Sequence, residues 1–153
     1  MPSFGGVVDF ADVADRINPS VVNIDASSPS GEDREPRRRR RPEDWFDGPP
    51  GPEPENGRQG AGSGFIIDRQ GYILTNHHVI DDAERIIVTL GDGRTFRASV
   101  VGADPAIDVA LIRIPATDDL LAAPLGDSTK LRVGEWVCAI GNPLGYEHTV
   151  TVG

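Results

Sequence analysis

Short apolar runs separated by turn residues make up the hydrophobic pattern of this chain. Runs of about four to eight residues that alternate, or that are rich in Val, Ile and Phe, predict strands. They occupy residues 20–25, 63–67, 72–75, 85–90, 95–101, 109–114 and 135–140. In the last run Trp136, Cys138 and Ile140 share one face. About seven short strands joined by turns predict an all-β fold, a small barrel or sandwich.

One segment near the N-terminus has helical rather than alternating spacing. Residues 9–17 predict a short helix with Asp9 as its N-cap, and Asn18-Pro19 ends it. The apolar positions of this helix fall on one face: Phe10, Val13, Ala14 and Ile17.

Residues 27–60 differ in composition from the rest of the chain. They contain seven Pro, five Gly, seven Arg and eight acidic residues, and their only strongly apolar side chains are Trp45 and Phe46. Such a stretch buries too little apolar surface to offset the entropy lost on ordering. We therefore predict a disordered loop here, inside a chain of 153 residues that otherwise has normal core content.

The formal net charge is −9, from 15 basic and 24 acidic residues. The loop holds seven of the basic and eight of the acidic residues, so the remainder carries eight and 16, a net charge of −8. An acidic body opposes binding to a phosphate backbone, so no nucleic-acid partner is expected. The run 37–41 of five arginines is interpreted as a solvated tract balanced by acidic neighbours, with contact to an acidic partner as the alternative.

Several other classes of protein find no support in the sequence. No apolar run approaches the length of a transmembrane segment, and residues 1–6 lack the basic start and apolar stretch of a signal peptide. Three His and one Cys without paired spacing predict no metal site. The glycines of 60–64 precede a strand rather than a helix, so no dinucleotide cofactor is expected.

Candidate chemistry lies at two places. His77 and His78 follow the run 72–75, and a histidine held at a strand end can face a cleft and act as a general base; the alternative is a structural histidine. Asp108 precedes an apolar run, so its carboxylate is expected to be partly buried and to need a donor such as an imidazole N–H. The alternative for Asp108 is to cap a turn through backbone amides.

Four ordered motifs then suggest a family. They are Gly-Ser-Gly-Phe-Ile-Ile at 62–67, Gly-Tyr-Ile-Leu-Thr-Asn-His-His-Val at 71–79, Asp-Val-Ala-Leu-Ile at 108–112 and Gly-Asn-Pro-Leu-Gly at 141–145. Together they resemble the HtrA (Deg-type) serine proteases, a branch of the chymotrypsin-like fold. The resemblance implies an all-β chain with a single antiparallel β-barrel, the first barrel of a double-barrel fold, plus a short N-terminal helix and a long disordered loop.

The same resemblance implies a division of the chain and assigns site residues. Its parts are the N-terminal helix and first strand (1–26), the loop (27–60), the remainder of the first barrel (61–148) and the start of a second barrel (149–153). The family pattern Thr-Asn-Asn-His-Val aligns its catalytic histidine with His78 and leaves His77 as a bystander. The family aspartate aligns with Asp108, not with Asp104.

The resemblance also implies a serine endopeptidase of the protein quality-control type. The family nucleophile lies in Gly-Asn-Ser-Gly-Gly, which does not occur in these 153 residues. We therefore expect the half that carries the catalytic His and Asp but lacks the Ser, inactive by itself. The alternative is a catalytically inactive β-barrel binding module that associates with protein partners through its exposed half-interface.

Partners and location follow from the family in the same way. The expected substrates are unfolded or misfolded proteins, and the full-length protein is expected to be a homotrimer assembled through N-terminal segments, with Phe4 and Phe10 as candidates. The expected location is the periplasm or cell envelope. No cofactor is expected.

Overall fold

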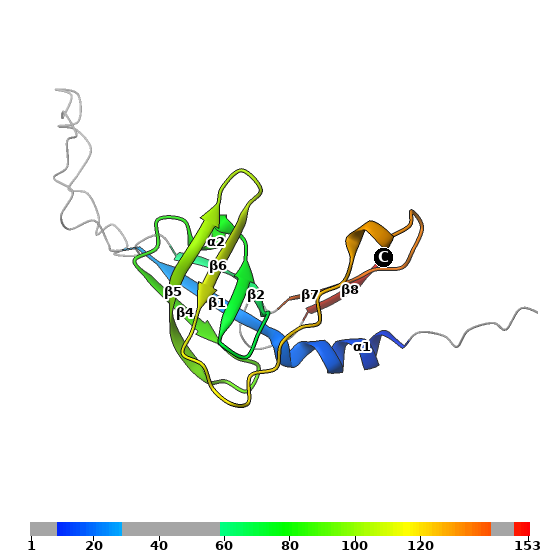
Figure 1. Cartoon of the computed structure of the whole chain (residues 1–153), viewed down its shortest axis with the longest axis horizontal. Coiled ribbons are helices and arrows are strands. Elements are labelled where there is room, and N and C mark those ends of the chain that lie inside the picture. Colours follow the sequence, from blue (N-terminus) through cyan, green and yellow to red (C-terminus); the bar gives the residue numbers. More distant parts are fainter. Residues whose placement is uncertain (1–8, 29–58, 142–148) are drawn as a thin grey trace, which may run out of the picture.

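Six strands close into an antiparallel barrel in the order β1-β2-β3-β6-β5-β4 (Figure 1). This computed structural model describes residues 9–28, 59–141 and 149–153. The barrel strands are β1 Val21–Ser27, β2 Gln59–Ile66, β3 Tyr72–Thr75, β4 Arg85–Thr89, β5 Thr95–Asp104 and β6 Val109–Arg113. The all-β prediction and the single barrel are confirmed.

The barrel encloses a core of branched aliphatic side chains, which suit a pleated and half-buried surface. The largest side chains fully removed from solvent come from nearly every strand and from the segment after β6: Ile24, Ile66, Ile73, Ile112, Ile114, Leu120, Val22 and Val88. In β6 only Ala110 and Ile112 are buried, whereas Val109 is 38% exposed. The run 109–114 is thus apolar in sequence on both faces but buried on one.

The N-terminal helix is α1, Phe10–Ile17, and its prediction is confirmed. Asp9 caps it, because one of its carboxylate oxygens accepts the backbone N–H of Ala11 at 2.9 Å. A 3₁₀ turn over Asn18–Ser20 ends the helix and leads directly into β1.

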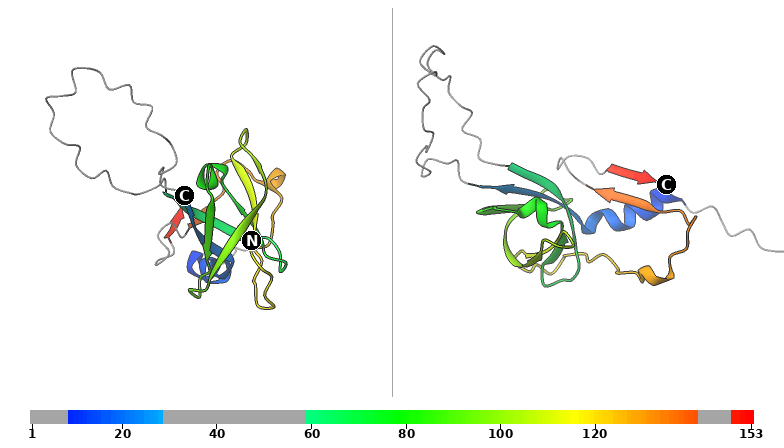
Figure 2. Two further views of the ribbon diagram at one scale, coloured as in Figure 1. Left: turned by 90° about the vertical axis from the view of Figure 1, so that its left-hand side faces the viewer. Right: turned by 90° about the horizontal axis from the view of Figure 1, so that it is seen from above.

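A second, two-stranded sheet lies outside the barrel and beside α1 (Figure 2). Its strands are β7 Cys138–Gly141 and β8 Thr149–Val152, and a short 3₁₀ turn, Ser128–Lys130, precedes them. Phe10 of α1 packs against Trp136, with ring centroids 6.4 Å apart. The strand β7 begins at Cys138, three residues later than the strand predicted over 135–140. Glu135 belongs to a turn instead, in which its N–H donates to the carbonyl of Arg132 and Gly134 has a φ of 90°.

Part of the sequence-based description lies outside the described residues. This applies to Phe4, to the arginine run 37–41, to all but the first residue of the motif at 141–145 and to the loop predicted over 27–60 apart from its ends. Those ends belong to the barrel, because Ser27 of β1 pairs with Gln59 of β2. Within the described ranges, no helix is long and apolar enough to cross a membrane.

Candidate active site

The antiparallel pairing of β3 with β6 brings the two candidate regions together. Thr75 at the end of β3 lies opposite Ala110 near the start of β6. The residues that follow Thr75 therefore meet the residues that precede Ala110. A four-residue helix, α2, His77–Ile80, begins directly after β3. His78 on this helix thus lies next to Asp108, 30 residues away in sequence.

His78 and Asp108 form two hydrogen bonds. Nδ1 of the imidazole lies 2.7 Å from Oδ2 of the carboxylate, and the backbone N–H of His78 donates to Oδ1 at 2.9 Å. A carboxylate can only accept, so Nδ1 carries the proton that forms this bond. In the neutral ring Nε2 then keeps its lone pair. The His78 side chain is 71% exposed, so a reacting group can approach it.

These bonds also set the charge state of the carboxylate. The backbone N–H of His78, followed by its imidazole, holds the pKa of Asp108 below its ordinary value, since both favour the charged form. A charged carboxylate beside the ring keeps the imidazole oriented and favours an imidazolium if one forms. With Nδ1 bonded to the carboxylate, Nε2 is the ring nitrogen of His78 from which a proton could be accepted.

Replacing Asp108 with Asn should make the stability of the protein less sensitive to acid. A carboxylate whose pKa is depressed by folding contributes stability that is present above its unfolded pKa of about 4 and is lost as pH falls through the lower folded pKa. The difference in the free energy of unfolding between wild type and Asp108→Asn should therefore shrink from about pH 5 to about pH 2. Urea titrations at a series of pH values measure it. A difference that stayed constant across that range would contradict a lowered pKa of Asp108 in the folded protein.

The contacts also bear on the turn-capping alternative for Asp108 and on the position of His77. The turn cap beside Pro105 is made by Asp104, which accepts the backbone N–H of Ala106 at 2.9 Å. Asp108 instead accepts an amide from a distant segment. The side chain of His77 lies beside Asp81, with Nε2 3.7 Å from Oδ1, and no hydrogen bond joins it to Asp108 among the described contacts. His77 therefore takes no part in the His78–Asp108 contact.

Glycines of β2 allow α2 to approach the barrel wall. A Cβ on Gly62 would lie 2.6 Å from a methyl group of Val79, and one on Gly60 would lie 2.5 Å from the Val79 carbonyl oxygen. The segment just after α2 is held as well, because the hydroxyl of Ser28 donates to the carbonyl of Asp82 at 2.6 Å. The backbone that carries His78 is thereby fixed against β1 and β2.

Asn76 is a site residue that sequence reasoning quoted within a motif but assigned no role. Its side-chain nitrogen lies 3.1 Å from both the carboxylate and the carbonyl oxygen of Asp108. The signal available in the sequence was its position two residues before His78, at the point where β3 ends.

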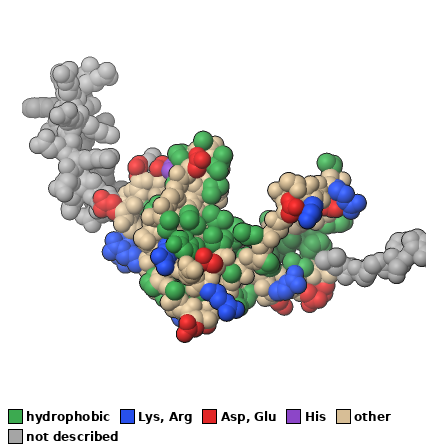
Figure 3. Space-filling view, in the orientation of Figure 1, with side chains coloured by type: hydrophobic (Ala, Val, Ile, Leu, Met, Phe, Trp, Pro, Cys, Tyr) green, Lys and Arg blue, Asp and Glu red, His purple; other side chains and the backbone are tan. Residues whose placement is uncertain are grey.

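An apolar groove of about 600 Å³ begins beside this site. Asn76 and Val109, which neighbour the histidine–aspartate pair, are among the residues that line it, and α1 and β7 contribute Ile17 and Ile140. An apolar surface therefore lies next to the exposed imidazole of His78. Figure 3 shows further hydrophobic side chains over β5 and β6. Val100 and Val101 within β5, and Ile107 in the turn that follows it, are at least half exposed.

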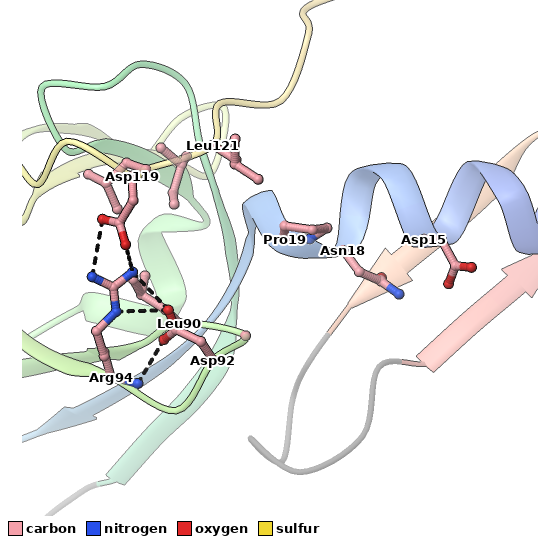
Figure 4. Close-up of a pocket in the computed structure, with 11 residues that line it drawn as sticks. Asp15, Asn18, Pro19, Leu90, Asp92, Arg94, Asp119 and Leu121 are labelled. Carbon is pink, nitrogen blue, oxygen red and sulfur yellow. Dashed lines mark hydrogen bonds and ion pairs between the residues drawn. The ribbon is translucent and has the colours of Figure 1, made fainter.

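A second hollow, of about 360 Å³, contains neither His78 nor Asp108. Here Arg94 bridges Asp92 and Asp119, and so joins the β4–β5 turn to the segment that leaves the barrel (Figure 4). The guanidinium is the main reason that the pKa of Asp119 lies below its ordinary value. Among the described residues no group of three or more His, Cys, Asp or Glu side chains could hold a metal ion.

Comparison with known proteins identifies relatives of this chain. The model of the trypsin-like peptidase domain matches residues 62–153. A putative serine protease HhoA from Synechocystis is 51% identical over 105 residues, which are 68% of this chain and 27% of that protein. A probable periplasmic serine endoprotease DegP-like from Marinomonas is 41% identical over 160 residues, covering 95% of this chain and 34% of that protein.

Solved structures give the same result for the fold. The HtrA-type protease AlgW, solved with a tripeptide, superposes with a TM-score of 0.72 at 33% identity and covers 95% of this chain. This chain in turn covers 39% of that structure. The chymotrypsin-like barrel expected from the motifs is confirmed. The chain spans about a third or less of the length of these two curated relatives.

Proposed function

Since this chain belongs to the HtrA-type trypsin-like serine proteases, we propose that it carries the histidine–aspartate part of their catalytic apparatus. The observation that carries the proposal is the 2.7 Å contact between His78 Nδ1 and Asp108 Oδ2 on an exposed imidazole. A serine nucleophile and an oxyanion hole would come from residues outside these 153, because the sequence contains no Gly-Asn-Ser-Gly-Gly motif.

The proposed reaction is hydrolysis of a peptide bond by acyl transfer. The serine hydroxyl attacks the peptide carbonyl while Nε2 of His78 accepts its proton. His78 then donates that proton to the departing amine, and water repeats the sequence on the acyl-enzyme. Asp108 keeps the proton of the neutral ring on Nδ1 and stabilises the imidazolium. These roles of His78 and Asp108 require the geometry described above and no cofactor.

The relatives suggest a substrate and a location. One of them is described as a periplasmic serine endoprotease, so we propose that the whole protein cleaves proteins in the periplasm or cell envelope, with unfolded or misfolded chains as substrates. A homotrimer assembled through N-terminal segments remains part of the proposal. Phe10 is one candidate contact, and its ring already packs against Trp136.

Two samples test the catalytic proposal. The 153-residue chain should neither cleave casein nor react with a fluorophosphonate probe, because it has no nucleophile in the required context. The protein translated from the complete gene should do both, and His78→Ala should abolish casein cleavage. Cleavage by the short chain, or full activity of His78→Ala in the complete protein, would overturn the assignment.

A second candidate function has a specific observation behind it. The apolar groove between the barrel, α1 and β7, together with exposed Leu131, Val133 and Trp136, offers a surface on which a protein partner could pack. The chain would then be a catalytically inactive binding module. This reading predicts self-association in light scattering and retention of casein. A monomer that does not bind casein would exclude it.

A further inference from the structure

Asp108 has an unusual backbone conformation for the residue whose carboxylate orients His78. Its φ is 54°, in the left-handed region that L-residues other than Gly, Asn and Asp seldom occupy. In this conformation Oδ1 and Oδ2 reach the backbone and the ring of His78 at the same time. Whatever stabilises this conformation therefore also stabilises the His78–Asp108 geometry.

Asn76 makes the two contacts that restrain it. One side-chain nitrogen lies 3.1 Å from the carbonyl oxygen of Asp108 and 3.1 Å from its Oδ2. An amide –NH₂ has two hydrogens, so a single group can serve both acceptors. The carbonyl bond restrains the peptide plane that follows Asp108, and the carboxylate bond restrains its side chain.

Asn76 makes these two contacts instead of capping the helix that it precedes. It occupies the N-cap position of α2, where an Asn side chain normally accepts an N–H of the first helical turn. Here its side chain makes no such bond, and the N–H of His78 goes to Asp108 instead. Asp108 thus caps the helix that carries His78, while Asn76 holds Asp108. The three residues form one closed set of contacts.

We propose that Asn76 is a positioning residue that sets the histidine tautomer, by holding Asp108 in its left-handed conformation through two hydrogen bonds. Without these bonds Asp108 can relax to ordinary backbone angles and its carboxylate turns away from Nδ1. The neutral ring of His78 then loses the acceptor that keeps its proton on Nδ1. The Nε2–H form, which cannot accept a proton at Nε2, becomes populated.

The test is an NMR measurement on the 153-residue chain itself. At about pH 9, well above the usual titration range of histidine, the ¹⁵N shifts of the ring report the ratio of the two neutral tautomers. Wild type should be mainly Nδ1–H. Asn76→Ala removes the donor, and Asn76→Asp keeps the shape of the side chain but offers only acceptors. Both should raise the Nε2–H to Nδ1–H ratio by about three- to tenfold, the range for loss of the one hydrogen bond that Nδ1–H of His78 donates to Asp108.

His77→Asn is the matched control. It lies next to Asn76 on the same turn but contacts Asp81 rather than Asp108, so the tautomer ratio should remain that of wild type. Methyl resonances of the barrel core report whether each variant is folded. If Asn76→Ala and Asn76→Asp are folded and their ratios stay within about twofold of wild type, below the loss expected for one bond, the inference is overturned. Loss of folding in both, with His77→Asn folded, would also overturn it, because Asn76 would then be a stability residue.

The inference rests on the proposed function only for its catalytic meaning. In the complete protein Asn76→Ala should lower kcat about three- to tenfold and leave KM unchanged, because the tautomer acts on the chemical step rather than on binding. The tautomer ratio is read without any proteolysis. A changed ratio in a protein that never cleaves peptides would contradict the proposed function alone, whereas an active protease with an unchanged ratio would contradict the inference alone.

Discussion

Gly64→Ala should destabilise the barrel by about 3 kcal/mol, the upper part of the range for overpacking a core. A Cβ at this position of β2 would lie 2.8 Å from Ile24 Cδ1, 2.8 Å from the carbonyl oxygen of Leu74 and 2.9 Å from Ile73 Cγ2. Two of these neighbours are methyl groups of fully buried core side chains, and the one on Ile73 is attached directly to its Cβ and cannot move without the whole side chain. The third is the backbone of β3, which is held in its ladder with β6 and cannot give way cheaply.

Gly102→Ala is the matched control for this substitution. Gly102 also lies in a barrel strand, β5, but a Cβ there would meet no atom within 4 Å. It should leave stability unchanged or raise it slightly, since Ala loses less backbone entropy than Gly on folding. Urea unfolding of both variants gives the comparison. Equal midpoints for the two would show that close packing at Gly64 contributes little to the barrel.

The apolar pattern was sufficient to predict most of the barrel, but it gave a poor account of β2. Strands were predicted where Val, Ile and Phe cluster, and the run 63–67 gave only the last part of this strand. Its first residues, from Gln59 to Gly62, contain no large apolar side chain. They pair with β1 all the same, and the glycines at 60 and 62 leave room for Val79 of α2 to lie against this part of the strand. The first half of β2 is therefore defined by its pairing with β1 and cannot be predicted from its own apolar residues.

The candidate site, too, was predicted only in part from the sequence. The residue types at His78 and Asp108 suggested a base and a carboxylate, but the residues alone left structural readings open for both. Their meeting depends on the register of β3 against β6, which places Thr75 opposite Ala110. That register involves residues far apart in sequence and cannot be derived from local pattern, so the pairing of the two came from family resemblance.

Two features near the site were missing from the sequence-based description because tertiary contacts produce them. The helix α2 has only four residues, too short for its apolar spacing to be distinguished from a turn. The role of Asn76 depends on the left-handed backbone of Asp108, which nothing in the sequence around position 108 requires.

In the complete protein, Asp108→Asn should lower kcat for peptide hydrolysis by about 10³- to 10⁴-fold. The substitution keeps the size of the side chain but replaces one carboxylate oxygen with an –NH₂ donor. A donor facing Nδ1 needs a lone pair there, so the ring proton moves to Nε2, the nitrogen that must accept the proton of the serine. The variant also lacks the negative charge that stabilises the imidazolium in the transition state. KM should change little, because neither effect concerns substrate binding.

Asp104→Asn makes the same chemical change four residues upstream. Asp104 caps its own turn by accepting the N–H of Ala106, which the amide oxygen of Asn can accept as well, and it has no contact with His78 among those described. This variant should therefore retain kcat within about threefold, no more than the effect of one weak hydrogen bond. The ¹⁵N shifts of His78 in the 153-residue chain link the kinetics to the cause, since Asp108→Asn should shift the neutral ring to the Nε2–H form and Asp104→Asn should not. Equal losses of kcat in the two variants would mean that charge near the site matters but orientation of His78 does not. Full activity of Asp108→Asn would remove Asp108 from the catalytic apparatus altogether.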